Sequence, residues 1–108
     1  MSTTDTGRVT MDIDGHICTI TVDNTAKKNA YTPAMLDQVA EFMTTYEENG
    51  DLWVCIFCSA GEHTTAGLDM PRFFGPTAEP SRRRPGLVDP FGLERRCTKP
   101  VIAVVQGI

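Results

Sequence analysis

Residues 52–69 read LWVCIFCSAGEHTTAGLD, and this stretch indicates the kind of fold to expect. The apolar run at 52–58 is too short for a typical helix, and its continuous apolar character is typical of a strand buried on both faces of a parallel or mixed sheet. The polar segment that follows, at 59–69, contains glycine and predicts a loop. Ligands of open α/β sheets usually bind at the carboxyl ends of strands, so this loop is the first place to look for a site.

A β-hairpin is predicted before this strand. Residues 8–14 and 16–22 each alternate apolar and polar side chains, which is the periodicity of half-buried strands. The Asp14-Gly15 dipeptide between them favours a tight hairpin turn. A polar, turn-rich loop at 23–31 then leads out of the hairpin.

A helix is predicted between the hairpin and the strand. Thr32 is suited to the N-cap and Pro33 to the first helical position. One face is expected to pack on a core, because apolar residues recur there at helical spacing: Leu36, Val39, Ala40, Met43 and Tyr46. Asn49-Gly50 is expected to end the helix, with the glycine in a left-handed conformation.

The last third of the chain predicts irregular structure and a second strand. Asp69 is a candidate cap for a short helical piece with Pro71 in its first turn. The proline- and arginine-rich segment 75–90 predicts a partly mobile surface loop, residues 91–97 a short helix, and residues 101–105 another buried strand. This progression predicts an α/β fold in which right-handed crossovers place the strands side by side.

Composition narrows the choice of partners. Apolar residues make up 41% and charged residues 22% of the 108 residues, as in ordinary globular domains. A net charge of −4 argues against nucleic acid as the main partner. No apolar run approaches the roughly 20 residues that cross a bilayer, so no membrane partner is expected. The start, Met1 to Gly7, lacks the plan of a signal peptide. We therefore expect a cytoplasmic protein whose cysteines are reduced, namely Cys18, Cys55, Cys58 and Cys97.

The candidate chemistry lies in the segment Glu62 to Asp69 (EHTTAGLD). Glycine and small residues let a ligand approach the backbone closely. Amide N–H groups at such a turn are free to point at an anion or at a polarised carbonyl oxygen. From these residues alone, a plain connecting loop and a ligand site both stay open as interpretations.

The order of the segments resembles the crotonase superfamily (the enoyl-CoA hydratase/isomerase family) along nearly the whole chain. Residues 27–30 (KKNA) precede the helix, residues 65–69 (TAGLD) follow the first buried strand, and residues 99–107 (KPVIAVVQG) form the second. Each motif is short, but their order and spacing are fairly specific. The resemblance implies a partial crotonase-like ββα spiral, with 1–108 as the N-terminal part of one domain.

The resemblance also implies roles for particular residues. The backbone N–H of Leu68 would be one of two donors of an oxyanion hole that binds the thioester oxygen of an acyl-CoA. Ala66 and Gly67 would line the pantetheine end of that thioester. Lys28 and Ala30 match the loop that holds the adenine and phosphate end of CoA, where a lysine meets a phosphate as a point charge.

The remaining expectations concern what the chain carries alone. Asp69 belongs to the substrate-binding loop by resemblance, although helix capping explains it more simply. The second N–H donor and the catalytic glutamates of the family follow Gly107, so the resemblance implies that the 108-residue chain by itself is inactive. No metal is expected, and no cofactor except the CoA of the substrate. The intact protein is expected to form homotrimers or hexamers.

Several residues have a plain structural interpretation beside a functional one. Cys55 and Cys58 have C-x-x-C spacing, but residues three apart in a strand point to opposite faces, so two buried thiols are favoured over a metal site. His63 is interpreted as a solvated loop residue rather than a substrate contact. The arginines at 82–84 are taken as a solvated charge run rather than a CoA phosphate site. Trp53 is expected in the core or in a subunit interface.

Three functions remain open. The first is acyl-CoA thioester chemistry through a stabilised enolate, as in an enoyl-CoA hydratase/isomerase-like lyase of fatty acid metabolism. The second is a non-catalytic acyl-CoA-binding or assembly module, because the chain lacks the family's glutamates. The third, a small redox protein, requires thiols with a low pKa.

Overall fold

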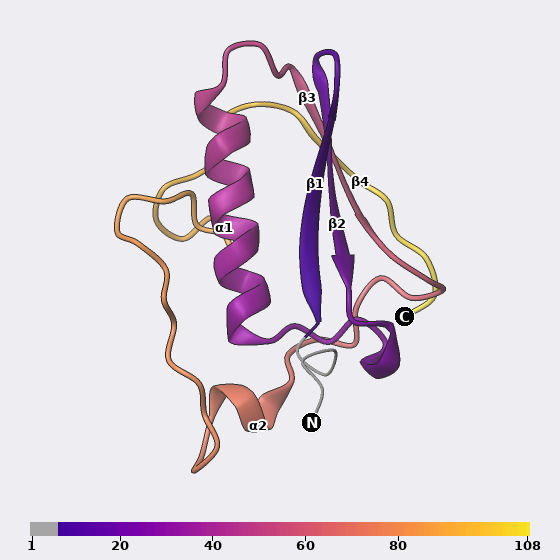
Figure 1. Cartoon of the computed structure of the whole chain (residues 1–108), viewed down its shortest axis with the longest axis vertical. Helices are drawn as coiled ribbons and strands as arrows, with labels where there is room; N and C mark the ends of the chain where they lie inside the picture. Colours follow the sequence, from indigo (N-terminus) through magenta and orange to yellow (C-terminus); the bar gives the residue numbers. More distant parts are fainter. Residues whose placement is uncertain (1–6) are drawn as a thin grey trace.

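The computed structural model describes residues 7–108 and shows one sheet with a long helix packed on one face (Figure 1). The prediction that no signal peptide opens the chain concerns Met1 to Gly7, of which only Gly7 is among the described residues. Four strands lie in chain order across the sheet: β1 (Arg8–Asp14), β2 (Ile17–Asp23), β3 (Val54–Ser59) and β4 (Val101–Ala103). β1 runs antiparallel to β2, whereas β2, β3 and β4 are mutually parallel. The predicted α/β class and the adjacent strands are confirmed.

The hairpin of β1 and β2 forms as predicted. Asp14 pairs with Ile17, so Gly15 and His16 make a two-residue loop. Gly15 has a φ of 62°, a conformation that glycine adopts without steric cost. Beyond the turn, alternate residues of β2 face the helix and are buried: Cys18, Ile20 and Val22.

Helix α1 (Pro33–Glu48) begins where the sequence predicts. The Thr32 hydroxyl accepts a hydrogen bond from the Met35 N–H at 3.2 Å, and Pro33 occupies the first turn. The helix also ends at Asn49, but the expected left-handed glycine is wrong, because Gly50 has no positive φ. Instead, the Asn49 side chain accepts from the Asp51 N–H at 2.9 Å, and this contact shapes the exit from the helix.

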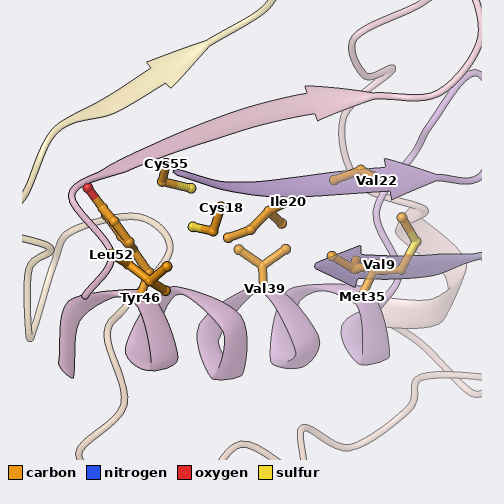
Figure 2. Close-up of a cluster of buried hydrophobic side chains, with 9 residues drawn as sticks. All are labelled: Val9, Cys18, Ile20, Val22, Met35, Val39, Tyr46, Leu52 and Cys55. Carbon is orange, nitrogen blue, oxygen red and sulfur yellow. The ribbon is translucent and has the colours of Figure 1, made fainter. Parts of the chain in front are cut away.

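The core lies between α1 and the sheet. Figure 2 shows α1 facing β1, β2 and β3 across a single cluster of apolar side chains: Val9, Cys18, Ile20, Val22, Met35, Val39, Tyr46, Leu52 and Cys55. The Tyr46 hydroxyl donates to the Pro100 carbonyl at 2.5 Å, which satisfies its polar end inside the cluster. Burial raises the pKa of Tyr46 to about 12, so the phenol stays neutral at physiological pH.

The expectation that the strands at 52–58 and 101–105 are buried on both faces is wrong. Cys55 is the only fully buried residue of β3, and Ile102 of β4 is 55% exposed. The reason is that α1 packs against β1 and β2 on one face of the sheet and leaves all three residues of β4 exposed. Trp53 is 59% exposed and stacks on His16 with ring centroids 3.6 Å apart, so it does not lie in the core, and the alternative of a subunit interface stays a prediction.

The segment after β3 contains one short helix, α2 (Met70–Phe73), with Pro71 in its first turn as predicted. Residues 75–90 contain no helix or strand, which agrees with the predicted loop. The loop runs beside α1, where the Arg84 guanidinium donates to the Glu41 carboxylate at 2.8 and 2.9 Å. The arginines at 82–84 are exposed, as expected of a charge run.

The predicted helix at 91–97 is wrong. The Asp89 carboxylate accepts hydrogen bonds from the backbone N–H groups of Phe91, Leu93 and Glu94. A side chain that binds nearby N–H groups in this way competes with helix formation, and the segment forms turns and bends instead. β4 is also shorter than predicted and ends at Ala103. No helix within residues 7–108 combines the length and the apolar character of a membrane-spanning segment.

Candidate functional site

Two loops meet at the carboxyl ends of β2 and β3, and we call them the paired loops: residues 24–31 before α1 and residues 60–69 after β3. The Tyr31 N–H donates to the Gly67 carbonyl at 2.7 Å, and the Asp69 N–H donates to the Tyr31 carbonyl at 2.8 Å. Tyr31 and Leu68 therefore form a one-residue parallel bridge. The structure thus brings together the KKNA and TAGLD segments, which are far apart in the sequence.

The bridge leaves the backbone N–H of Leu68 unused. The N–H groups on either side are engaged, because Gly67 donates to the Thr65 hydroxyl at 3.0 Å and Asp69 donates to Tyr31. Successive N–H groups of extended backbone point in opposite directions, so Leu68 directs its N–H away from Tyr31. Within residues 7–108 this N–H has no acceptor. It is therefore available to a ligand, and a ligand carbonyl oxygen is its natural acceptor.

The backbone conformation at residue 67, and not crowding by neighbouring atoms, explains why a glycine stands there. Its φ is 98°, which L side chains rarely adopt, yet a Cβ placed there would meet no atom within 4 Å. With this conformation the Gly67 carbonyl accepts from the Tyr31 N–H, and the Leu68 N–H points away from Tyr31. The expected approach of a ligand to Gly67 stays a prediction.

Asp69 holds the paired loops to α2 through its side chain. Its carboxylate accepts from Lys27 Nζ at 3.1 Å and from Arg72 Nε at 3.2 Å, and the side chain is only 10% exposed. No side-chain cap bond forms at the start of α2, so the predicted capping role is wrong. Both cations draw the carboxylate away from the N–H groups of that four-residue helix.

An apolar cavity of about 520 Å³ lies against the paired loops. α1 and the sheet form its walls, and Gly67 and Leu68 lie among its lining residues. The sequence had placed Leu36, Val39 and Met43 on the packing face of the helix and Thr65 in the TAGLD segment. The other lining residues were not singled out: Tyr31, Phe57, Pro90, Phe91, Val101 and Ala103. Strand alternation carried a signal for some of them, because Phe57 pairs with Ala103 and follows the buried Cys55 by two residues.

A second, more polar hollow of about 370 Å³ lies on another part of the paired loops. Lys28, Glu62 and His63 contribute its charged and titratable side chains. Of the residues expected to bind substrate, Lys28 lines this hollow, and Gly67 and Leu68 line the apolar cavity. Ala30 and Ala66 line neither, and Ala30 is buried beneath the loop.

The remaining residues singled out from the sequence are His63 and the cysteines. His63 is half-buried, and its Nδ1 accepts from the Ile108 N–H at 3.3 Å, so it is less solvated than expected. The four cysteines are free thiols. Burial raises the pKa of Cys55 to about 12, which disfavours the reactive thiolate that the redox hypothesis requires. Among the described residues, no three His, Cys, Asp or Glu side chains lie close enough together to hold a metal ion.

Fold and site together define an α/β protein in which a backbone N–H without an acceptor among the described residues lies at the ends of parallel strands. The match in structure is to crotonase-fold proteins. A probable enoyl-CoA hydratase/isomerase from Mycobacterium abscessus superposes with a TM-score of 0.76 at 25% identity, covering 90% of this chain and 38% of that one. An enoyl-CoA hydratase from Mycobacterium tuberculosis H37Rv gives 0.76 at 26% identity, covering 93% and 38%.

The sequence comparisons agree, although no protein-family model matches the chain. The probable enoyl-CoA hydratase EchA14 of Mycobacterium tuberculosis is 31% identical over 102 residues, which cover 92% of this chain and 39% of that protein. The hydroxycinnamoyl-CoA hydratase-lyase of Pseudomonas fluorescens is 29% identical over 105 residues, covering 92% and 38%. The chain is thus crotonase-like in both sequence and fold, as the order of its segments indicated. It spans about two fifths of the length of these curated relatives.

Proposed function

We propose that this chain supplies the acyl-CoA recognition part of an enoyl-CoA hydratase/isomerase-type enzyme, with the Leu68 N–H donating to the thioester oxygen. One observation carries the proposal: this N–H has no acceptor within the described residues, and Leu68 lines an apolar cavity of about 520 Å³. The acyl chain then occupies the apolar cavity, and the thioester oxygen at its end accepts a hydrogen bond from the Leu68 N–H. The names of the relatives, which are CoA hydratases, support the same ligand.

The polar hollow suits the other end of the ligand. Lys28 lines it and presents a positive charge that complements a CoA phosphate. Lys27 is held by Asp69 and is the less available of the two lysines. The paired loops thus contribute to both recesses, Lys28 to the polar one and Leu68 to the apolar one.

The chemistry assigned to Leu68 is stabilisation of an oxyanion. When a thioester is attacked at its conjugated double bond or loses a proton beside the carbonyl, negative charge collects on the oxygen. A preorganised N–H lowers that barrier, and removal of one such donor commonly costs about 2.7–4 kcal/mol. Among the described residues that line the apolar cavity, none is Asp, Glu or His. We therefore assign this chain the polarising donor and not the general base.

Nuclear magnetic resonance of the ¹⁵N-labelled chain tests the proposal. Crotonyl-CoA is expected to shift the Leu68 amide signal downfield, because a carbonyl oxygen accepts from that N–H, and free CoA is expected to leave it in place. Lys28→Ala should weaken binding of both ligands, whereas Arg96→Ala, at an exposed arginine far along the chain, should weaken neither. A Leu68 signal that does not move when crotonyl-CoA is saturating would exclude the oxyanion role.

A non-catalytic acyl-CoA-binding module remains the second candidate, favoured by the lack of a carboxylate in the described cavity lining. Loss of the conjugated thioester absorbance of crotonyl-CoA separates the two functions. Binding without turnover by the 108-residue chain fits the expectation that it is inactive alone. Turnover by this chain would show that its own residues supply a base. The trimeric or hexameric assembly and the cytoplasmic location stay predictions.

A further inference from the structure

Asn29 is the most constrained polar residue of the paired loops. It is 1% exposed, and its φ is 60°, a left-handed conformation that asparagine tolerates better than most residues other than glycine. Lys28 before it is left-handed as well, with a φ of 52°. Two such residues in sequence turn the loop sharply and bring the Asn29 side chain under the segment that follows β3.

The Asn29 side-chain amide uses both donors and an acceptor. Its Nδ2 donates to the Ala60 and His63 carbonyls at 2.7 Å each, and its Oδ1 accepts from the Asn24 N–H at 2.7 Å. One buried amide therefore fastens the loop before α1 to the start of the loop after β3. Buried amides that are fully bonded define one arrangement of the groups they join.

The Asn29 backbone reaches the end of the same loop. Its carbonyl accepts from the Thr65 hydroxyl at 2.7 Å, and that hydroxyl accepts from the Gly67 N–H at 3.0 Å. Two hydrogen bonds thus connect Asn29 to the residue directly before Leu68. Asn29 lines the polar hollow and not the apolar cavity, which it reaches only through Thr65.

From these contacts we infer that Asn29 is a positioning residue, which holds the Leu68 N–H where a thioester oxygen can accept from it. The inference rests on the proposed function and extends it to a residue that does not touch the reacting atoms. The Nδ2 bonds fix where the loop leaves β3, and the Thr65 relay fixes where Gly67 turns. An oxyanion donor acts only within a few tenths of an ångström of its proper place, so both ends of the loop matter.

Two substitutions separate the side chain from the backbone conformation. Asn29→Asp keeps the size and the acceptor for Asn24, but it replaces two donors with an anionic oxygen facing two carbonyls. Asn29→Gly keeps the left-handed backbone at no steric cost and removes every side-chain bond. A matched control is Thr44→Ala in α1, which removes a buried hydroxyl that bonds Ala40 and Val88 far from the loops.

The decisive measurement is the ratio of affinities for crotonyl-CoA and for the S-crotyl thioether of CoA, which lacks the carbonyl oxygen. The wild-type chain is expected to prefer the thioester roughly threefold to tenfold, the range of one net hydrogen bond. Both Asn29 variants should lose this preference and bind the two ligands about equally. Thr44→Ala should keep it, because a loss of general stability alone does not move the Leu68 N–H.

Amide hydrogen exchange gives a second readout that needs no ligand. In both Asn29 variants the Gly67 N–H should exchange at least about tenfold faster, while amides in the middle of α1 keep their rates. If the Asp variant does not fold, Thr65→Val replaces it; it removes the hydroxyl of the relay and keeps the size of a side chain that also lines the apolar cavity.

The outcomes separate the two claims. If the wild-type chain does not distinguish thioester from thioether, the proposed function fails and the inference fails with it. If the wild-type chain does distinguish them and the Asn29 variants do so equally, the inference alone is overturned. Unchanged Gly67 exchange in these variants would overturn it too.

Discussion

The core between α1 and the sheet and the paired loops at the strand ends are held together by different forces. In the core, nine side chains exclude water from one another, and nearly all are apolar or weakly polar. In the paired loops, short hydrogen bonds of 2.7–3.0 Å connect backbone and side chains with little apolar burial. Burial tolerates small adjustments of position, whereas a hydrogen-bonded loop has one working geometry. Stability and ligand recognition should therefore respond to different substitutions.

The largest effect on stability is expected from Ile20→Ala in β2. Ile20 is fully buried between α1 and the sheet, and removing its outer carbons leaves a cavity. Substitutions of this kind cost about 2–5 kcal/mol in the free energy of unfolding, measured by urea denaturation. Ile13→Ala is the matched control, because Ile13 lies in the same hairpin and is 56% exposed. Equal losses for both variants would contradict the one-sided core.

Gly67→Ala should have a smaller effect on stability and a larger one on recognition. An alanine at a φ of 98° is strained by about 1–3 kcal/mol, although space is available for its methyl group. Relief of that strain by turning the backbone moves the neighbouring Leu68 N–H, so the preference for thioester over thioether should disappear. Gly15→Ala in the hairpin turn, with a φ of 62° and equally open space, should cost stability without changing the preference. Loss of preference in both variants would show that the thioester preference does not depend on the paired loops in particular.

The two regions also differ in how far the sequence predicted them. The hairpin and α1 were predicted because their signals are local: alternation in the strands, Thr32 before Pro33, and apolar residues at helical spacing. Leu68 was placed by resemblance, and its unused N–H needed the structure to become visible. Asn29 was missed as an organiser because its side-chain bonds to Ala60 and His63 span 31 and 34 residues.

The failed predictions have physical causes of the same kind. The helix expected at 91–97 does not form, because the Asp89 carboxylate accepts hydrogen bonds from three backbone N–H groups of that segment. The strands expected to be buried on both faces have apolar sequences, and sequence pattern alone does not tell which layer covers them. Cavities depend on how side chains pack, so the continuous apolar run at 52–58 did not reveal the space beside Phe57.

Asp69→Asn should reduce stability still less. It tests whether the backbone of Asp69, rather than its side chain, positions the paired loops. The change removes the charge that attracts Lys27 and Arg72, but the Asp69 N–H still donates to Tyr31. Partly exposed ion pairs contribute about 0–1 kcal/mol, and we expect a loss in that range. The thioester preference should persist, since Leu68 keeps its position. The comparison variant is Glu79→Gln, which weakens only the outer contact with Arg72. A lost preference in Asp69→Asn alone would show that its side chain positions the loop.

The smallest effect on stability and on acyl-CoA binding is expected from protonation of Asp89, next to the apolar cavity. Hydrogen bonds from the backbone N–H groups of Phe91, Leu93 and Glu94 lower the pKa of this carboxyl below its ordinary value. A lowered folded-state pKa means that the stabilising contribution is complete above the unfolded-state pKa of about 3.9 and is lost as the pH falls through the lowered value. The amide signals of these residues should therefore stay unchanged near neutral pH and move together in acid. Because Phe91 lines the cavity, acyl-CoA binding should weaken over the same acidic range. Asp89→Asn should reproduce that weakening at neutral pH, and amide signals that moved only near pH 6 would point to a histidine instead.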